Sequence, residues 1–348
     1  MRKWTACLLA LLLAALPACG RPEPETPRYE ATFLTLFDTV TTIVGYTDDK
    51  AAFTEEAQLI HDELERYHRL YDIYHDYEGV HNIKTINDRA GVAPVRVDRP
   101  VIDLLLEAKE LYAFTGGKVN VAFGSVLSIW HDYRERGIDD PLSAELPPME
   151  KLREAAEHTD IDKIVIDEAA STVYLADPEM RLDVGAVAKG YAVERACRAA
   201  EAEGVESLLV SVGGNVRAVG SVDGRGSPWK VGVQNPDMGE AGSQFLCTVG
   251  LTDRSLVTSG SYQRYYTVDG RTYHHIIDPE TLMPAAYYTA VSVLTPDSGV
   301  ADALSTALYN MPYEEGLALV EGMEDTEALW VMPDGSLRES GGFAEAVV

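Results

Sequence analysis

Residues 182–220 read LDVGAVAKGYAVERACRAAEAEGVESLLVSVGGNVRAVG, and this stretch decides the fold class. Its apolar pattern predicts a strand that passes through a glycine turn, with Gly185 and Gly190 flanking the entry, into a long helix. Two strands follow, joined at Gly213-Gly214. Strands separated by helices, with hairpins added, predict a mixed α/β protein rather than a β-sandwich.

The rest of the chain continues this alternation of helices and strands. Apolar residues at helical spacing predict helices over three ranges, the first with Asp48 as its N-cap: 50–71, 99–115 and about 148–157. Alternating apolar runs predict a single strand over 33–46, a hairpin over 162–176, and further strands over 229–235 and 247–251. The length predicts either two domains or one large α/β domain.

The composition is that of an acidic globular protein. Of the 348 residues, 46% are hydrophobic and 24% are charged, and the formal net charge is −27. No run of basic residues appears anywhere in the chain. Because binding to nucleic acid needs clustered Lys and Arg against the phosphates, this charge excludes nucleic acid as an expected partner.

The N-terminal segment has the pattern of a signal peptide. Arg2 and Lys3 are basic, and a short apolar run over 6–16 follows them. The run is too short to span a bilayer, so we predict that residues 1–18 are a cleaved signal peptide. A small residue followed directly by Cys19 is similar to the bacterial lipobox, in which the cysteine becomes the lipidated first residue. The alternative is an ordinary signal peptide with an incidental cysteine.

A lipid on Cys19 would decide where the protein is found. Residues 20–28, GRPEPETPR, are rich in Pro and Glu and predict a flexible tether, which we extend over 19–30. Residues 31–348 would then form the folded part. We expect it to lie on the extracytoplasmic face of the cell membrane, held there by the lipid anchor.

Two thiols remain in the folded part, Cys197 and Cys247. Neither belongs to a Cys-x-x-Cys motif or a Cys/His cluster, and two thiols are too few for a disulfide framework. We predict that both are buried as small apolar residues. The sequence leaves open whether they form one bridge.

A polar segment near the C-terminus carries the first candidate site residues. The Asp269-Gly270 pair between two aromatic runs predicts a hairpin. His274 and His275 follow it, and strand alternation would send them to opposite faces, so that only one faces a site. Histidine and the nearby Asp278 suit a proton shuttle or a phosphate-side donor. The alternative is a hairpin with polar edges.

Asp302 and Thr306 lie four residues apart at the start of a predicted helix. This spacing places both side chains on one helical face. A carboxylate and a hydroxyl are hard oxygen ligands, which suit Mg²⁺ better than Zn²⁺. The alternative is that Asp302 is a first-turn acid stabilised by the helix dipole, with Asp297 or Ser298 as the N-cap.

The glycine turn over 183–191 is a second candidate site. A turn that enters a helix offers free backbone N–H groups to a phosphate. The residues match neither G-x-G-x-x-G nor the P-loop motif, because Gly190 rather than Ser or Thr follows Lys189. A conventional dinucleotide or ATP site is therefore disfavoured, and a purely structural turn remains the alternative.

Two segments of the N-terminal half are candidates for ring contacts. The aromatic and polar segment over 71–97, which includes Tyr74, predicts either core packing or a wall for a flat ring. Gly124-Ser125 would let the backbone approach a ligand closely.

Together these segments resemble one family, the FAD:protein FMN transferases, also called the ApbE flavin transferases. The resemblance covers about residues 31–335. The motifs that carry it occur in the family's order along the chain: Phe37-Asp38-Thr39, Asn87 with Gly91, residues 119–130, 182–191 and 213–215, Thr258 to Arg264, residues 275–279, and Ala301 to Ala307.

The resemblance implies a fold and a reaction. The fold would be mixed α+β, with T-fold-like sheets, packed helices and an active site in a cleft between two intertwined subdomains. Members of the family bind FAD with Mg²⁺ and transfer its FMN half, through a phosphoester, to a Thr or Ser hydroxyl of a target flavoprotein. AMP is released.

The resemblance also implies roles for particular residues. The Mg²⁺ ion would be held by Asp302, Thr306 and the backbone carbonyl of Ala186. The FAD-binding positions would be Phe37, Tyr74, Ala122, Phe123, Gly124, Ser125, Asp183, Lys189, Arg264, His275 and Ile276. The resemblance places His275 beside the pyrophosphate, and our own hypothesis is that His275 or Asp278 assists removal of the proton from the target hydroxyl. The chain departs from the family at Phe37, where Met is frequent, and at Lys189, where Glu is frequent.

Two other functions remain open from the sequence. The same residues would support Mg²⁺-dependent hydrolysis of FAD to FMN and AMP, with water replacing the protein hydroxyl. A lipoprotein that binds flavin without catalysis is the third reading, although retention of FAD alone does not require a metal. The resemblance implies acceptor subunits of membrane redox complexes, of the Rnf and sodium-pumping NADH:quinone oxidoreductase kind, as partners.

Overall fold

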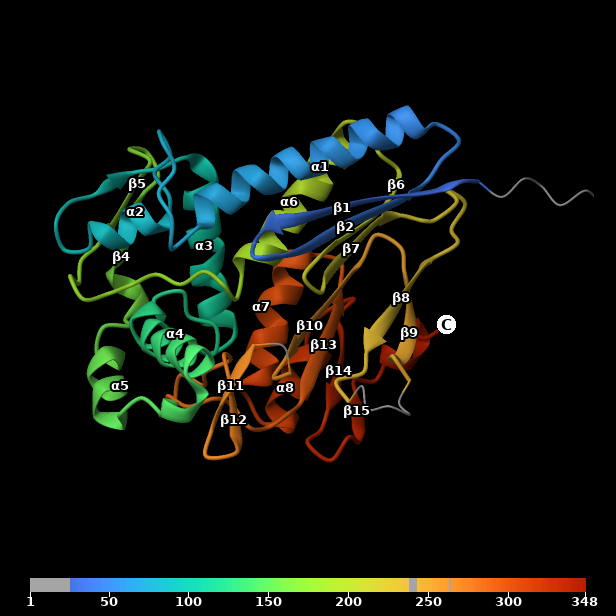
Figure 1. Ribbon diagram of the computed structural model, residues 1–348. Helices are drawn as coiled ribbons and strands as arrows, with labels where there is room; N and C mark the ends of the chain where they lie inside the picture. Colours follow the sequence, from blue (N-terminus) through green and yellow to red (C-terminus); the bar gives the residue numbers. More distant parts are fainter. Residues whose placement is uncertain (1–25, 238–242, 263) are drawn as a thin grey trace, which may run out of the picture.

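The computed structural model of the chain describes residues 26–237, 243–262 and 264–348 (Figure 1). The predicted signal peptide over 1–18 and the predicted lipidation site at Cys19 lie outside the described residues. No helix within the described ranges combines the length and the apolar character needed to cross a membrane.

A large antiparallel sheet forms the centre of the molecule. Its strand order is β1-β2-β6-β7-β10-β13-β14-β15, and every neighbouring pair is antiparallel. The strands are β1 (Arg28–Leu36), β2 (Thr39–Tyr46), β6 (Ser207–Val212), β7 (Asn215–Gly220), β10 (Ser255–Gly260), β13 (Ala290–Thr295), β14 (Glu327–Val331) and β15 (Leu337–Glu339). All six residues of β13 are buried, so this strand lies at the middle of the core.

Two helices cover one face of this sheet, and a third lies on them. α7 (Ser298–Tyr309) packs on β10 and β13, and α6 (Ala188–Ala202) packs on β7 and on α7. α1 (Lys50–Tyr71) runs across α6 and β1 (Figure 1). Its apolar residues at helical spacing are buried, and Asp49 caps it by accepting hydrogen bonds from the N–H groups of Ala51 and Ala52 at 2.8 and 3.1 Å.

Smaller elements surround this core. Beside α7, α4 (Gly124–Asp139) packs on α5 (Met149–Ala156) and on β11 (Tyr265–Val268), which forms a hairpin with β12 (Arg271–His274) (Figure 1). The remaining elements are α2 (Ile83–Asp88), α3 (Arg99–Phe114), α8 (Tyr313–Glu321), the sheet of β3 (Val95–Arg96), β5 (Thr172–Leu175) and β4 (Ile164–Asp167), and the pair β8 (Trp229–Gln234) and β9 (Phe245–Leu251).

The mixed α+β class predicted from the sequence is confirmed by these helices and sheets, and the predicted helices and hairpins are present. Asp297 caps α7, as one of the two predicted alternatives, whereas α1 is capped by Asp49 and not by Asp48. Cys197 is buried and Cys247 is half-buried, and both are free thiols. The division of residues 31–348 into two subdomains stays a prediction.

Two strand predictions were wrong. The single strand expected over 33–46 is the hairpin β1–β2, because Phe37 and Asp38 form its turn with φ angles of 53° and 52°. β1 begins at Arg28, so the last residues of the tether predicted over 19–30 belong to a strand. The strand expected before the glycine turn is absent from the described chain, where a single bridge between Phe123 and Arg181 stands in its place.

Gly190 lets α6 and α7 approach each other closely. A Cβ atom at this position would lie 2.2 Å from the carbonyl oxygen of Ser298 and 2.5 Å from the Cβ of Asp302. We therefore expect Gly190→Ala to lower the free energy of unfolding by about 1–3 kcal/mol, measured by urea denaturation.

The matched control is Gly322→Ala, where a Cβ would meet no atom closer than 3.5 Å. This control should stay within about 0.5 kcal/mol of the unaltered protein. Equal stability of Gly190→Ala and the unaltered protein would contradict the close contact between α6 and α7.

Candidate functional site

A cavity of about 940 Å³ lies where several of these elements end. Its walls come from the β1–β2 turn, the end of α1 and the segment after it, α4, the glycine turn before α6, the end of β10, the β11–β12 hairpin and α7. The cavity therefore joins parts of the sequence that are more than two hundred residues apart.

Asp302 of α7 forms part of one wall and is only 4% exposed. Its Oδ2 accepts a hydrogen bond from the N–H of Gly190 at 2.8 Å, and its Oδ1 lies 3.4 Å from Nζ of Lys189. The first-turn alternative for Asp302 was wrong, because α7 begins at Ser298 and has no acid in its first turn. The carboxylate instead lies at the N-terminal end of a different helix, α6, where the helix dipole favours a negative charge.

Thr306 lies one turn after Asp302 and lines the same cavity, as does Ala186 of the glycine turn. The Oγ1 of Thr306 is 3.4 Å from Oγ of Ser259, a cavity residue that the sequence analysis did not select. A buried carboxylate with lone pairs still available, a hydroxyl and a backbone carbonyl are the oxygen donors that Mg²⁺ prefers. The residues at this wall therefore fit a magnesium ion.

Both neighbouring histidines line the cavity, so the prediction that only one faces the site was wrong. β12 ends at His274, and strand alternation does not extend to His275. Both ring nitrogens of His274 are bonded within the protein, because Nε2 donates to the carbonyl of Ala285 at 2.8 Å and Nδ1 accepts from the N–H of Ile276. His274 is therefore a structural residue.

His275 keeps a ring nitrogen for chemistry. Its Nδ1 donates to the carbonyl oxygen of Arg264 at 3.2 Å, which leaves Nε2 as an acceptor in the neutral ring. Burial, together with the charge of Arg264, lowers the pKa of His275 to about 3. The imidazole is therefore neutral at pH 7, with a lone pair at Nε2.

Asp278, the other candidate for proton removal, does not belong to the cavity wall. It is 2% exposed, and its Oδ1 accepts from the N–H of Glu280 at 3.0 Å and lies 3.6 Å from Nζ of Lys118. The carboxylate is thus occupied in organising the turn after β12, and its assignment as a base is not supported by its position.

The aromatic part of the cavity contains Phe37, Tyr74 and Phe123. The N–H of Phe37 donates to Nδ1 of His68 at 3.3 Å, and the two rings are 5.4 Å apart. His68 therefore holds the turn that carries Phe37. No local pattern in the sequence predicts this contact, which joins α1 to the β1–β2 turn.

Asp72 holds the segment that carries Tyr74. Its Oδ1 accepts from the N–H groups of Tyr74 and His75, and its Oδ2 accepts from the hydroxyl of Tyr77 at 2.8 Å. Burial alone would raise the pKa of the Asp72 carboxyl, but these hydrogen bonds lower it below its ordinary value. Residues 71–77 of the segment therefore line the cavity, whereas Ile83, Ile86 and Val95 further along it are packed in the core.

The turn over 122–125 was predicted to contact the rings, and only its Phe123 does line the cavity. Ala122 is fully buried, and Oγ of Ser125 donates to the carbonyl of Glu179 at 3.1 Å. A Cβ at Gly124 would lie 2.5 Å from the carbonyl oxygen of Arg181. The close approach that Gly124 permits is therefore to the protein's own backbone and not to a ligand.

Basic side chains reach the cavity from four different segments. Among the described residues, those that line it are Lys118, Arg134, Lys189 and Arg264. Arg134 is held by a contact of 2.8 Å between its Nη2 and Nδ1 of His131. Asp183 also lines the cavity, where burial raises its pKa, and its Oδ1 accepts from the N–H of Gly185. Ile276 completes the predicted residues found there.

Comparison with known proteins decides the family. The model of the ApbE family matches residues 37–330, most of the chain. The chain belongs to the ApbE family. The resemblance inferred from the sequence is thereby confirmed.

Individual relatives agree with this assignment. The FAD:protein FMN transferase of Treponema pallidum (strain Nichols) is 34% identical over 76% of this chain and 74% of its own length. The protein of the same name from Klebsiella pneumoniae (strain 342) is 30% identical over 82% and 84%. The crystal structure of the ApbE protein from Thermotoga maritima, 28% identical, superposes with a TM-score of 0.80 and covers 92% of this chain and 99% of that one. The predicted fold of the family is therefore confirmed.

The low pKa of His275 predicts a dependence of stability on pH. In the unfolded chain the His275 ring has its ordinary pKa of 6.5 and binds a proton below that pH, whereas in the folded chain the ring binds this proton only near pH 3. The free energy of unfolding therefore falls as the pH drops through this range. His275→Gln should make the fall less steep, measured by urea unfolding between about pH 7 and 4. An unchanged slope would show that His275 binds its proton equally well in both states.

Proposed function

We propose that this protein transfers the FMN half of FAD to a Thr or Ser hydroxyl of a flavoprotein, with the help of Mg²⁺ and with release of AMP. One observation carries the proposal. The Asp302 carboxylate accepts a hydrogen bond from the N–H of Gly190 and so lies beside the glycine turn that leads into α6. Both line one wall of a cavity whose other walls contain aromatic rings. The family assignment and the names of the relatives support the same reaction.

The reaction exchanges the phosphoanhydride bond of the pyrophosphate for a phosphoester bond at the same phosphorus. The oxygen of the acceptor hydroxyl would form a bond to the FMN phosphorus, and the bond from that phosphorus to the bridging pyrophosphate oxygen would break. AMP leaves with that oxygen, and the hydroxyl proton must be taken up by a base or by water. Such a transfer depends mainly on positioning and on neutralising charge.

Asp302, Thr306 and the carbonyl of Ala186 would hold the Mg²⁺ ion. When bound, this ion neutralises negative charge on the pyrophosphate. Lys189 and Arg264 line the same cavity and can pair with phosphate oxygens. In a chain with a formal charge of −27, these local cations are needed to attract a doubly charged group.

His275 is the residue we assign to proton removal. Its Nδ1 is bonded to the carbonyl of Arg264, so the acceptor nitrogen Nε2 is held in a defined orientation. Because its pKa is about 3, the ring is not protonated in advance at neutral pH. An acceptor hydroxyl within hydrogen-bond reach of Nε2 could therefore give up its proton there as the new bond forms.

We also propose that the mature protein is anchored through a lipid on Cys19 to the extracytoplasmic face of the cell membrane. The basic start, the short apolar run and the small residue before Cys19 support this proposal. Acceptors would then be flavoprotein subunits of membrane redox complexes of the Rnf or sodium-pumping NADH:quinone oxidoreductase kind, which share that location.

The test is incubation with FAD, Mg²⁺ and a purified flavoprotein subunit that carries a Ser/Thr-Gly-Ala-Thr/Ser acceptor motif. We expect covalent flavin fluorescence on the acceptor after denaturing electrophoresis, and AMP in equal amount. Free FMN and AMP without a labelled acceptor would instead show an FAD hydrolase. Tightly bound FAD with neither product would show a flavin carrier.

The role of Asp302 is tested by Asp302→Asn. The amide oxygen can still accept from the N–H of Gly190, so the fold should persist while the negative charge is lost. We expect activity to fall on the order of 100-fold and the Mg²⁺ requirement to rise, measured with the same acceptor assay. Asp334→Asn, an exposed turn residue, is the matched control and should keep full activity. Full activity of Asp302→Asn would contradict the metal site.

A further inference from the structure

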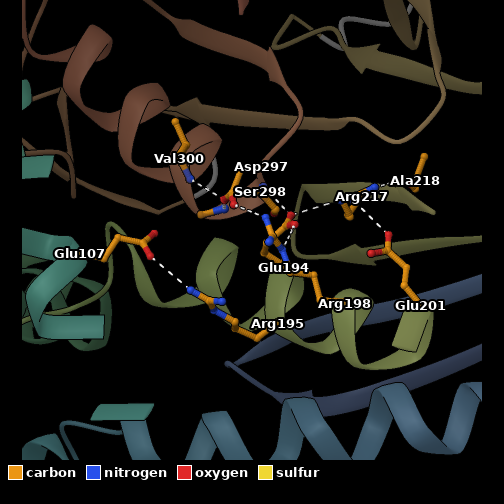
Figure 2. Close-up of polar contacts among 11 residues, drawn as sticks. Glu107, Glu194, Arg195, Arg198, Glu201, Arg217, Ala218, Asp297, Ser298 and Val300 are labelled. Carbon is orange, nitrogen blue, oxygen red and sulfur yellow. Dashed lines mark hydrogen bonds and ion pairs between the residues drawn. The ribbon is translucent and has the colours of Figure 1, made fainter. Parts of the chain in front are cut away.

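A buried carboxylate lies between α6 and α7 outside the cavity (Figure 2). Glu194 is 3% exposed. Its Oε2 accepts from the backbone N–H of Ser298 at 2.9 Å and from Nε of Arg217 at 3.2 Å. Its Oε1 accepts from Nε of Arg198 at 2.8 Å. Glu194 therefore connects α6 to the first residue of α7 and to β7.

The N-terminal turn of α7 depends on this contact. The first four N–H groups of a helix have no partner within the helix itself, and in α7 three of them belong to Ser298, Gly299 and Val300. Asp297 accepts from those of Gly299 and Val300 at 2.8 and 3.1 Å, and that of Ser298 is taken by Glu194 (Figure 2). Arg198 joins the two carboxylates, since its Nη2 lies 3.1 Å from Oδ2 of Asp297.

A second hydrogen bond connects the same two helices at the cavity. Gly190 and Glu194 are four residues apart on α6, and Ser298 and Asp302 are four residues apart on α7. Gly190 forms a hydrogen bond with Asp302, and Glu194 forms one with Ser298. These two hydrogen bonds connect antiparallel helices and lie about one helical turn apart. A shift of either helix along its axis would break both hydrogen bonds.

We propose that Glu194 is a positioning residue for Asp302. By holding Ser298, it fixes the register of α7 on α6 and so keeps the Asp302 carboxylate against the N–H of Gly190 at the cavity wall. Glu194 itself does not line the cavity, so it would act through Asp302. The consequence for metal binding rests on the proposed function, whereas the positioning of Asp302 can be measured without it.

The decisive variant replaces the buried pair, Glu194→Met with Arg217→Met. Removal of Glu194 alone would leave Arg217, which is only 6% exposed, without its buried partner and with only the partly exposed Glu201 beside its charge. Replacing both charges by apolar side chains of similar size avoids that cost. Glu201, the other partner of Arg217, is more exposed and stays hydrated. The double variant thus removes the tie to Ser298 without leaving an unpaired buried charge.

The readout is the hydrogen-exchange rate of the Gly190 amide in metal-free protein, since this N–H reports the position of Asp302. We expect it to rise roughly tenfold or more in the double variant. The Mg²⁺ concentration for half-maximal activity should also rise roughly tenfold, with a smaller change in the rate at saturating Mg²⁺. The single variant Glu194→Gln retains an oxygen that can accept from the N–H of Ser298, so the exchange of the Gly190 amide should stay slow in this variant.

A second variant guards against loss of folding. Ser298→Pro removes the N–H that Glu194 accepts and keeps the Glu194–Arg217 pair, and proline is well tolerated at the first position of a helix. It should give the same faster exchange at Gly190. The matched control is Glu201→Gln, which changes a partner of Arg217 without contact to α7 and should leave the exchange unchanged.

Slow exchange at Gly190 in a folded double variant or in folded Ser298→Pro would overturn the positioning role. An unaltered protein without any Mg²⁺ requirement would instead overturn the proposed function. In that case the exchange rate at Gly190 still decides whether Glu194 positions Asp302, so the two failures are distinguished.

Discussion

The close contact of α6 and α7 at Gly190 is the constraint on which the site depends. Only a residue without a side chain lets the carbonyl of Ser298 and the Cβ of Asp302 come so near to the backbone of α6. The contact brings the Asp302 carboxylate to the start of α6, where hydrogen bonding and the helix dipole stabilise it, by about 0.3–2 kcal/mol for the dipole alone. The glycine turn before α6 and the helix that carries Thr306 thereby share one wall.

Two groups of charged side chains lie near this contact, one outside the cavity and one inside it. Outside the cavity, Glu194 and Arg217 are buried against each other, so their charges are compensated and hold the helices in place. Inside it, Lys189 and Arg264 are available to an anionic ligand, although the chain as a whole is strongly acidic. Burial of paired charges supports structure, whereas cations in a hollow attract and orient a substrate.

The sequence predicted what depends on local periodicity. The placement of Asp302 and Thr306 on one helical face followed from the roughly 3.6 residues of each helical turn, and the helices followed from their apolar stripes. The β1–β2 turn was missed because Phe37-Asp38 lacks the Asn or Gly that usually adopts positive φ. The contact of His68 with Phe37 could not be predicted because it is made by tertiary packing. The position of Asp278 outside the cavity could not be predicted, because nearness in sequence does not give the direction of a side chain, and its carboxylate is bonded within the turn after β12.

The central claim is that the metal and the pyrophosphate meet at the junction of α6 and α7. Its most direct measurement is an anomalous difference map from crystals of the protein soaked with FAD and Mn²⁺, a substitute for Mg²⁺ with the same preference for oxygen ligands. We expect one strong peak at coordination distance from Asp302 and Thr306, next to the pyrophosphate. A peak elsewhere, for example among the acidic and histidine side chains of α1 at His61 and Glu65, with none at Asp302, would contradict the account.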